Sequence, residues 1–459
     1  MKIVIMKSLL IFIMTAFVLV SCKTNPISGT DSSVQNDSLK TTKNTDETDD
    51  YYQPNREKNI DAVYVDAIRT VQLYGSEWVF SPPVIYLTKN NQLTLSFDEL
   101  SNDMHDFYFT FELCDAQWNT VDLPQQDYLD GFFEDRITDY GYSRNTLTNY
   151  IHYSVNFPSE DMKPKLSGNY ILKVWTDDNG DRKTVITRRF FVSEQAVGIN
   201  MDVKKATRIE ERDYQHEIDF TINKSGVEII DPYRNMTVML QQNGRYDNII
   251  SDLKPRLIKG DEFDYNYESG NVFDAVNEFR HFDMKSLTYY TDRIAKIEKK
   301  DDGQFHVWLK DDSRRPYLRY ISEDDVNGRF LIKNDDGNDT DLESEYVWVH
   351  FFLGYDAPVL EGSLYLMGGF TDWNCSDAYK LDYSYKLKGY SDSLLLKQGY
   401  YNYHYVLLGT GTAVADETFI EGRHAEADSD YTIYVYYREP GELWDRLLGI
   451  QIMKSAKGL

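Results

Sequence analysis

The densest group of residues that could do chemistry lies in residues 127–146, in the stretch DYLDGFFEDRITDYGYSRNT. Its twenty residues include five carboxylates and five aromatic rings. Two carboxylates about 5 to 10 Å apart across a sugar would form the acid/base pair of a glycoside hydrolase. The same composition would also suit a binding edge with no chemistry, so the segment alone leaves both alternatives open.

Motifs of the common enzyme classes are absent from the sequence. It contains no G-x-S-x-G, no H-E-x-x-H, no P-loop and no strand-linked G-x-G-x-x-G. Asp-rich stretches at 177–181, 301–303 and 335–341 lack the oxygen spacing of an EF-hand, so tight turns explain them better than calcium sites. The eight histidines are scattered, which favours structural roles. We therefore expect no catalytic residue, no cofactor and no metal site, with a glycosidase at Asp127 to Asp139, to be tested at Asp130 and Glu134, as the enzyme alternative.

Length and composition limit the elements that could position these residues. With 459 residues, and about 150 residues per domain, the chain has room for roughly three domains. An aromatic share of 14%, including 36 Tyr, favours pleated sheet. The 75 acidic and 49 basic residues give a net charge of -26, which would repel nucleic acid. We therefore expect an all-β protein that binds no nucleic acid.

The N-terminus reads as a secretion signal. Lys2 and Lys7 precede an apolar run that ends in Leu-Val-Ser-Cys at Cys22, so residues 1–21 are predicted to be a signal peptide, with Met6 as an alternative start. This ending resembles a bacterial lipobox, which implies lipidation of Cys22 and a membrane anchor. Ordinary signal cleavage beside an incidental cysteine is the alternative. Residues 22–58 are mostly small and polar, and they predict a disordered tether.

The rest of the chain is rich in strand and turn signals. Short β-rich runs alternate with turns containing Gly, Asn and Asp, as in the predicted hairpin that places Tyr170, Leu172 and Val174 on one face. We predict three consecutive immunoglobulin-like or early-set β-sandwich domains, comprising residues 59–195, 196–356 and 357–459.

One stretch of the last predicted domain suggests a sugar site. The strings LMGGFTDWN and LKQGYYNYHYVL resemble early-set β-sandwich modules that bind glycogen and starch. In such a module Trp373 would stack on a sugar face. The alternative is a structural indole that closes the sandwich, because the pattern marks the fold more than the site.

A more extensive resemblance covers nearly the whole folded chain. Strings within residues 60–195, among them FTFELCDAQWN, DYLDGFFEDRITDYGYSRNTLTNYIHYSVNFP and MKPKLSGNYILKVW, resemble the first domain of the plug proteins of the bacterial type IX secretion system. The later strings MLQQNGRYDN, NEFRHFDMKSLTYY and FIEGRHAEADSDYTIYVYYREPGELWDRLLG resemble the middle and last parts of that family.

The resemblance implies a function without catalysis. Such a protein would sit in the periplasm and close the periplasmic mouth of the outer-membrane translocon barrel. The lipobox, independently of this resemblance, implies that a lipid on Cys22 holds the protein to the inner leaflet of the outer membrane. An outer-membrane glycan-binding lipoprotein is the alternative. Aromatic and acidic residues of the first domain are the candidate contacts with the barrel: Tyr128, Asp130, Phe132, Phe133, Glu134, Tyr140 and Tyr142.

Overall fold

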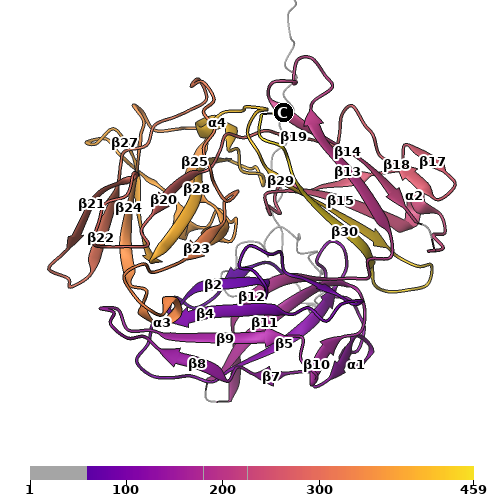
Figure 1. Ribbon diagram of the computed structural model, residues 1–459, viewed down its shortest axis with the longest axis horizontal. Coiled ribbons are helices and arrows are strands. Elements are labelled where there is room, and N and C mark those ends of the chain that lie inside the picture. The colour runs from indigo at the N-terminus through magenta and orange to yellow at the C-terminus, as the bar shows by residue number, and fades with distance from the viewer. Residues whose placement is uncertain (1–58, 179, 225, 459) are drawn as a thin grey trace, which may run out of the picture. The chain divides into compact units, whose positions relative to one another are not determined.

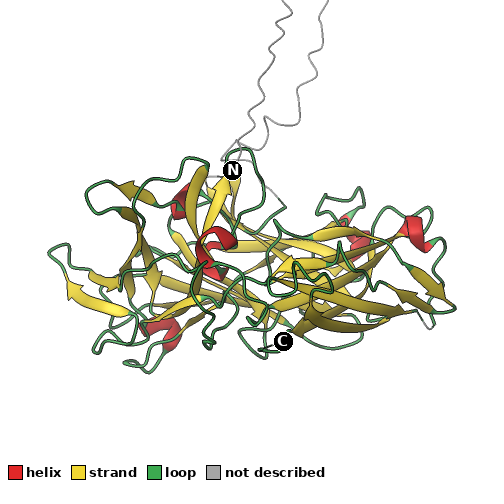
Figure 2. Ribbon diagram, turned by 90° about the horizontal axis from the view of Figure 1, so that it is seen from above, coloured by secondary structure: helices red, strands yellow, loops and turns green. Residues whose placement is uncertain are grey.

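The computed structural model describes residues 59–178, 180–224 and 226–458, which belong to one compact unit (Figure 1). The predicted signal peptide, Cys22 and the predicted tether lie outside the described residues. Strands dominate the described chain, and its helices are short turns (Figure 2). These helical turns are α1 (Gln125–Tyr128), α2 (Pro232–Asn235), α3 (Thr340–Glu343), α4 (Thr418–Glu421), η2 (Gly369–Thr371) and η3 (Asp377–Tyr379). The all-β prediction is confirmed.

No helix in the described part of the chain has both the length and the apolar character needed to cross a membrane.

Residues 59–195, which we call the first lobe, form two sheets around one core. The first sheet has the order β1 (Ala62–Val63), β12 (Asp181–Ser193), β11 (Gly168–Asp178), β5 (Phe107–Cys114), β7 (Asp135–Arg136), with β3 (Val84–Tyr86) beside β12. The second has the order β2 (Ile68–Gly75), β4 (Leu93–Glu99), β9 (Ile151–Phe157), β8 (Asp139–Tyr142), and a separate pair joins β6 (Leu129–Gly131) to β10 (Met162–Pro164). This lobe is a β-sandwich.

Alternation of side chains explains how the core of this lobe forms. In the hairpin of β11 and β12, Tyr170, Leu172 and Val174 are all fully buried on one face, as their two-residue spacing predicts. Phe109 and Phe111 of the neighbouring β5 belong to the same core, which both sheets share. Aromatic residues fit such a pleated, half-buried surface well, which explains their high share in the composition.

The second group of strands is discontinuous in sequence. One sheet has the order β13 (Gly198–Lys205), β14 (Gln215–Asn223), β18 (Glu262–Asp264), β17 (Leu257–Lys259), with β19 (Val272–Asp274) beside β14. The other has the order β16 (Ile250–Leu253), β15 (Met236–Gln242), β29 (Asp430–Tyr437), β30 (Arg446–Lys454). The C-terminal hairpin thus completes a core that begins near residue 201.

The third group of strands comes from the sequence between β19 and β29, the two strands that flank the gap in the second group. One sheet has the order β20 (Arg280–Asp283), β28 (Gly399–Gly409), β23 (Phe330–Ile332), with β25 (Gly362–Met367) beside β28. The other has the order β21 (Ile294–Lys299), β22 (Phe305–Leu309), β24 (Tyr346–Gly354), β27 (Gly389–Lys397), β26 (Asp382–Ser384). A single core joins both sheets.

Strand pairing therefore crosses the domain boundary predicted at residues 356 and 357. β24 lies before that boundary and pairs with β27, and β15 pairs with β29. Local sequence patterns identify strands but not their distant partners, so they do not reveal that β20 to β28 pair among themselves between β19 and β29. In place of the predicted division we propose a second lobe of residues 196–275 and 423–458 and a third lobe of residues 276–422. The immunoglobulin-like or early-set assignment remains a prediction.

Contacts join each lobe to both of the others. Phe191 of the first lobe stacks on Tyr434 of the second, with ring centroids 4.6 Å apart. Asp98 of β4 forms a buried ion pair with Lys397 of β27, at 2.6 Å, which joins the first lobe to the third. Arg245 of the second lobe pairs with Glu417 of the third in a buried position. These contacts fix the surroundings of the segment singled out in the sequence.

Candidate partner-binding edge

The segment 127–146 forms neighbouring edges of both sheets of the first lobe. β7 pairs with β5 at the end of one sheet, and β8 pairs with β9 at the end of the other. Only two residues separate β7 from β8, so the chain passes directly from one sheet to the other. Among the described strands, β7 and β8 have one partner each, which leaves backbone groups on their outer sides available for pairing.

Four aromatic side chains of the segment are exposed along this edge. Phe132 and Phe133 are 65% and 44% exposed, and Tyr140 and Tyr142 of β8 are 41% and 54% exposed. The two tyrosine rings contact each other edge to face at 6.2 Å, and Tyr140 also lies 5.9 Å from the core residue Tyr153. We call Phe132, Phe133, Tyr140 and Tyr142 the aromatic edge.

Tyr128 does not belong to this surface, which corrects its place among the candidate contacts. Its side chain is only 4% exposed and packs edge to face on Tyr170, at 6.1 Å. The residue ends the single turn of α1, which directs the ring into the core. A sequence pattern that crowds aromatic residues cannot separate those that face inwards from those that face outwards.

The acidic residues of the segment lie at the surface beside basic partners. Asp130 lies 3.5 Å from Lys163, and Glu134 lies 2.7 Å from Arg182. All four side chains are about half exposed. Pairs of this kind contribute only about 0 to 1 kcal/mol, because water and salt screen them. The geometry supports solvated acids that frame the aromatic edge more than a catalytic pair.

The far end of the segment is held by the third lobe. Arg144 pairs with Asp339 at 2.8 Å and with Glu343 at 2.9 Å, both beside or within α3. A Cβ atom on Gly141 would lie only 2.9 Å from the Leu342 side chain, so the backbone of β8 packs closely against α3. β8, which carries Tyr140 and Tyr142 of the aromatic edge, is therefore held in place by the third lobe.

Comparison with known proteins gives the family. A model described as "Type 9 secretion system plug protein 1st domain" matches residues 68–194. The crystal structure of a hypothetical protein from Parabacteroides merdae ATCC 43184 has 32% sequence identity and a TM-score of 0.84, over 87% of this chain and 100% of that chain. The chain belongs to the type 9 secretion system plug family. The matched residues of this plug-family protein include the whole aromatic edge.

Other comparisons add no further relationship for the plug-family protein. The C-terminal domain of the Streptococcus pyogenes antigen I/II-family protein AspA has 7% identity and a TM-score of 0.18, over 85% of this chain and 100% of that chain, which is too low to indicate a shared arrangement. No curated protein matches the sequence.

Trp373, the candidate sugar-stacking residue, packs against other residues of the third lobe of the plug-family protein. Its half-buried ring contacts Phe279 edge to face at 5.9 Å. A Cβ atom on Gly328 would lie 2.2 Å from Cη2 of the indole, so the ring packs directly against the backbone of this glycine. These contacts support the structural interpretation of the indole over a sugar platform.

A histidine pair in the plug-family protein was missed by sequence reasoning. His306 Nδ1 and His350 Nε2 are 2.8 Å apart, on the paired strands β22 and β24. The chain of contacts continues from His306 to Asp302 and from His350 to Ser393, at 2.8 and 2.7 Å. Burial, helped by the nearby His306 and Lys300, lowers the pKa of His350 to about 4. The sequence does not reveal that β22 and β24 pair in parallel, and it is this pairing that brings the two histidines together.

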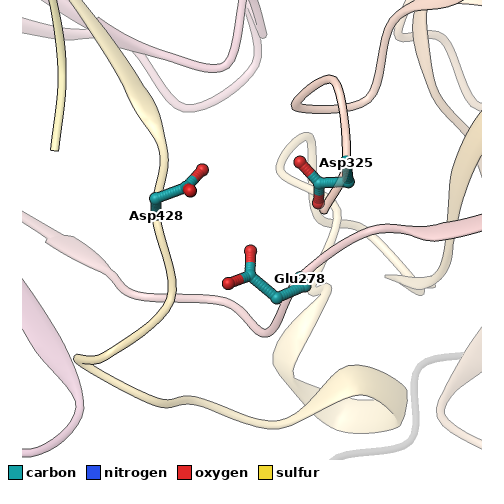
Figure 3. A group of neighbouring side chains, drawn as sticks. All are labelled: Glu278, Asp325 and Asp428. Atoms are coloured by element: carbon teal, nitrogen blue, oxygen red, sulfur yellow. The ribbon is translucent and has the colours of Figure 1, made fainter. Parts of the chain in front are cut away.

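A group of three acids in the plug-family protein was missed for the same reason. Glu278, Asp325 and Asp428 lie in three loops far apart in sequence, and their carboxylates point into a common space (Figure 3). Within the described residues they form a group that could hold a metal ion. The sequence predicted no metal site, because none of the three belongs to a ligand motif.

Proposed function

We propose that this protein is a non-enzymatic component of type IX secretion that binds the outer-membrane translocon and closes its periplasmic opening. Membership of the plug family supports this proposal. The observation that carries it furthest is the aromatic edge, a group of exposed rings on the edge strand β8 and on the connection between β6 and β7, inside the part of the chain that the plug-domain model matches.

The chemistry of the aromatic edge suits a protein partner. Large aromatic side chains supply much of the binding energy of protein interfaces, and a stable interface needs about 800 Å² per partner. Edge strands can also extend a neighbouring sheet through their free backbone groups. Asp130 and Glu134 would then form a polar rim beside the rings.

The attachment of the lobes to one another would help such a protein act as a closure. The buried pair of Asp98 and Lys397 and the contacts of Arg144 with α3 hold the first lobe against the third. Phe191 and Tyr434 hold it against the second. A closure must resist displacement until substrate arrives, and packed lobes meet that need better than freely hinged ones.

We further propose that the protein is periplasmic and anchored to the inner leaflet of the outer membrane through lipidated Cys22. The lipobox-like ending of the signal supports the anchor, and the family supports a site at the outer membrane. If protease added to intact cells removed the protein, a periplasmic location would be contradicted.

The closure itself can be tested in cells. A strain that lacks the protein should take up a large hydrophilic dye through the unplugged barrel, and the wild-type protein should restore the barrier. A variant with Phe132→Ser and Tyr142→Ser, expressed at the same level, should not restore it. An unchanged barrier in the deletion strain would contradict the proposed closure.

A further inference from the structure

The acids Glu278, Asp325 and Asp428 meet where the chain crosses between the second and third lobes. Glu278 lies between β19 and β20, on the outgoing segment, and Asp428 lies between α4 and β29, on the returning one. These two segments run side by side, since His424 N donates to Ala275 O at 2.7 Å. Asp325 comes from the loop between β22 and β23 of the third lobe.

The three carboxylates converge on one space. One oxygen of each residue lies within 4.8 Å of the others, and Figure 3 shows Glu278 between Asp325 and Asp428. Two oxygens that are both about 2.4 Å from one ion can be at most about 4.8 Å apart, which is the range for Ca²⁺ ligands. The spacing therefore allows a single ion to contact all three residues.

Burial leaves part of this group without a partner. Glu278 is 1% exposed, and its Oε2 has no hydrogen-bond partner, although Tyr320 donates to its Oε1 at 2.5 Å. Asp428 is 3% exposed and its oxygens accept no hydrogen bond, although Lys454 Nζ forms an ion pair with its Oδ1 at 3.0 Å. An unpaired carboxylate oxygen in such a place is costly, so the site needs a positive charge or a proton.

Asp325 is already oriented by the backbone. Its Oδ1 accepts from Asn327 N at 2.9 Å, and its Oδ2 accepts from Phe279 N at 2.6 Å. Both bonds keep the carboxylate in place next to the segment that carries Glu278. A ligand held by its own hydrogen bonds loses little freedom when an ion binds.

Two lysines supply only part of the missing charge. Lys454 Nζ is 3.0 Å from Asp428, while Lys457 Nζ is 3.7 Å from it and also pairs with Asp324 at 2.9 Å. Both lysines are partly exposed. Three carboxylates thus face two partly exposed ammonium groups, one of which is shared with Asp324.

We propose that Glu278, Asp325 and Asp428 bind a divalent cation of the calcium type, which fastens the crossing between the second and third lobes. Their all-oxygen donor set suits a hard cation and lacks the nitrogen or sulfur ligands that zinc prefers. Adaptable coordination favours Ca²⁺ over Mg²⁺, which demands octahedral geometry. This proposal does not depend on the proposed function in secretion.

Calorimetric titration of the full chain, stripped of metal with EDTA, tests the site with CaCl₂ and with MgCl₂ as separate probes. We expect saturable Ca²⁺ binding that is tighter than Mg²⁺ binding and that raises the melting temperature. Glu278→Gln and Asp428→Asn should each weaken Ca²⁺ binding by roughly 10-fold or more, because each removes a charged ligand. Glu77→Gln, which changes an exposed acid of the first lobe, should leave the affinity unchanged.

Two results would overturn the proposed cation site. Absence of Ca²⁺ binding to the wild-type protein would overturn the proposal and leave a proton as the compensating charge. Equal Ca²⁺ affinity of the wild type and both variants would overturn it too, since the ion would then sit elsewhere. If Glu278→Gln fails to fold, Asp325→Asn replaces it in the comparison, because its backbone bonds can persist with an amide oxygen.

Discussion

At the scale of single residues, Gly328 illustrates how one missing side chain makes room for another. Its φ of 78° and the indole of Trp373, 2.2 Å from where a Cβ would stand, both exclude larger residues. Gly328→Ala should therefore destabilise the fold by about 2 kcal/mol or more, since backbone strain alone costs about 1 to 2 kcal/mol. Urea unfolding measures this loss.

Gly303→Ala is the matched control for that substitution. Gly303 has a similar φ of 85°, but a Cβ there would meet no atom within 4 Å. The control should show the backbone cost of about 1 to 2 kcal/mol without the steric clash. Equal losses in the two variants would show that the indole does not depend on the space above Gly328.

His350 makes a residue-scale prediction about pH. Its pKa of about 4 in the folded protein lies below the ordinary value of 6.5, so the unfolded chain binds the proton more tightly. Stability should therefore decrease as the pH falls from 6.5 towards 4. Denaturant unfolding at pH 7 and pH 5 should show a smaller loss in His350→Gln than in the wild type. Identical losses would mean that His350 is not the group responsible.

At the scale of the elements, the contact between β4 and β27 joins two lobes through a charge pair. Asp98 and Lys397 are almost fully buried, and Asp98 also contacts His152 at 2.7 Å. Lys397→Met removes the ammonium and leaves the buried carboxylate with a weaker partner. We expect a loss of about 3 to 5 kcal/mol in the free energy of unfolding.

The exposed pair of Lys296 and Glu298 provides the control. Its ions are 2.6 Å apart but about half exposed. Lys296→Met should change the free energy of unfolding by no more than about 1 kcal/mol. Comparable losses at the two positions would contradict a special role for the junction between β4 and β27.

Sequence patterns predict elements well and their partners poorly. The hairpin with Tyr170, Leu172 and Val174 follows from a two-residue period and a turn signal, and the structure confirms it. The pairing of β15 with β29 has no local signal, so the predicted boundary at 356 and 357 does not follow the sheets. The same limitation hid the contact of His306 with His350 and the convergence of the three acids.

The candidate site was foreseen in part. Crowding of aromatic residues identified the segment 127–146, but only the register of β8 and the direction of α1 separate exposed Tyr142 from buried Tyr128. Edge position is a property of the sheets, and it leaves Tyr140 and Tyr142 of β8 exposed, while Phe132 and Phe133 are exposed on the connection between β6 and β7. Composition alone could not distinguish a catalytic cleft from a binding edge.

At the scale of the whole molecule, three packed lobes support one open aromatic edge. Each lobe contacts both others through at least one buried or aromatic contact. The net charge of -26 disfavours anionic surfaces as partners. An outer-membrane protein partner, as the plug family suggests, accounts best for an exposed aromatic row on a strand edge.

Binding of the full chain to the purified translocon in detergent tests the central claim most directly. The variant with Phe132→Ser and Tyr142→Ser should bind roughly 10-fold or more weakly, because loss of a central aromatic contact costs about 2 kcal/mol. The control with Tyr289→Ser and Tyr290→Ser removes rings that are 52% and 59% exposed on the third lobe, and it should bind like the wild type. Equal binding by all three proteins, or no binding by the wild type, would contradict the account.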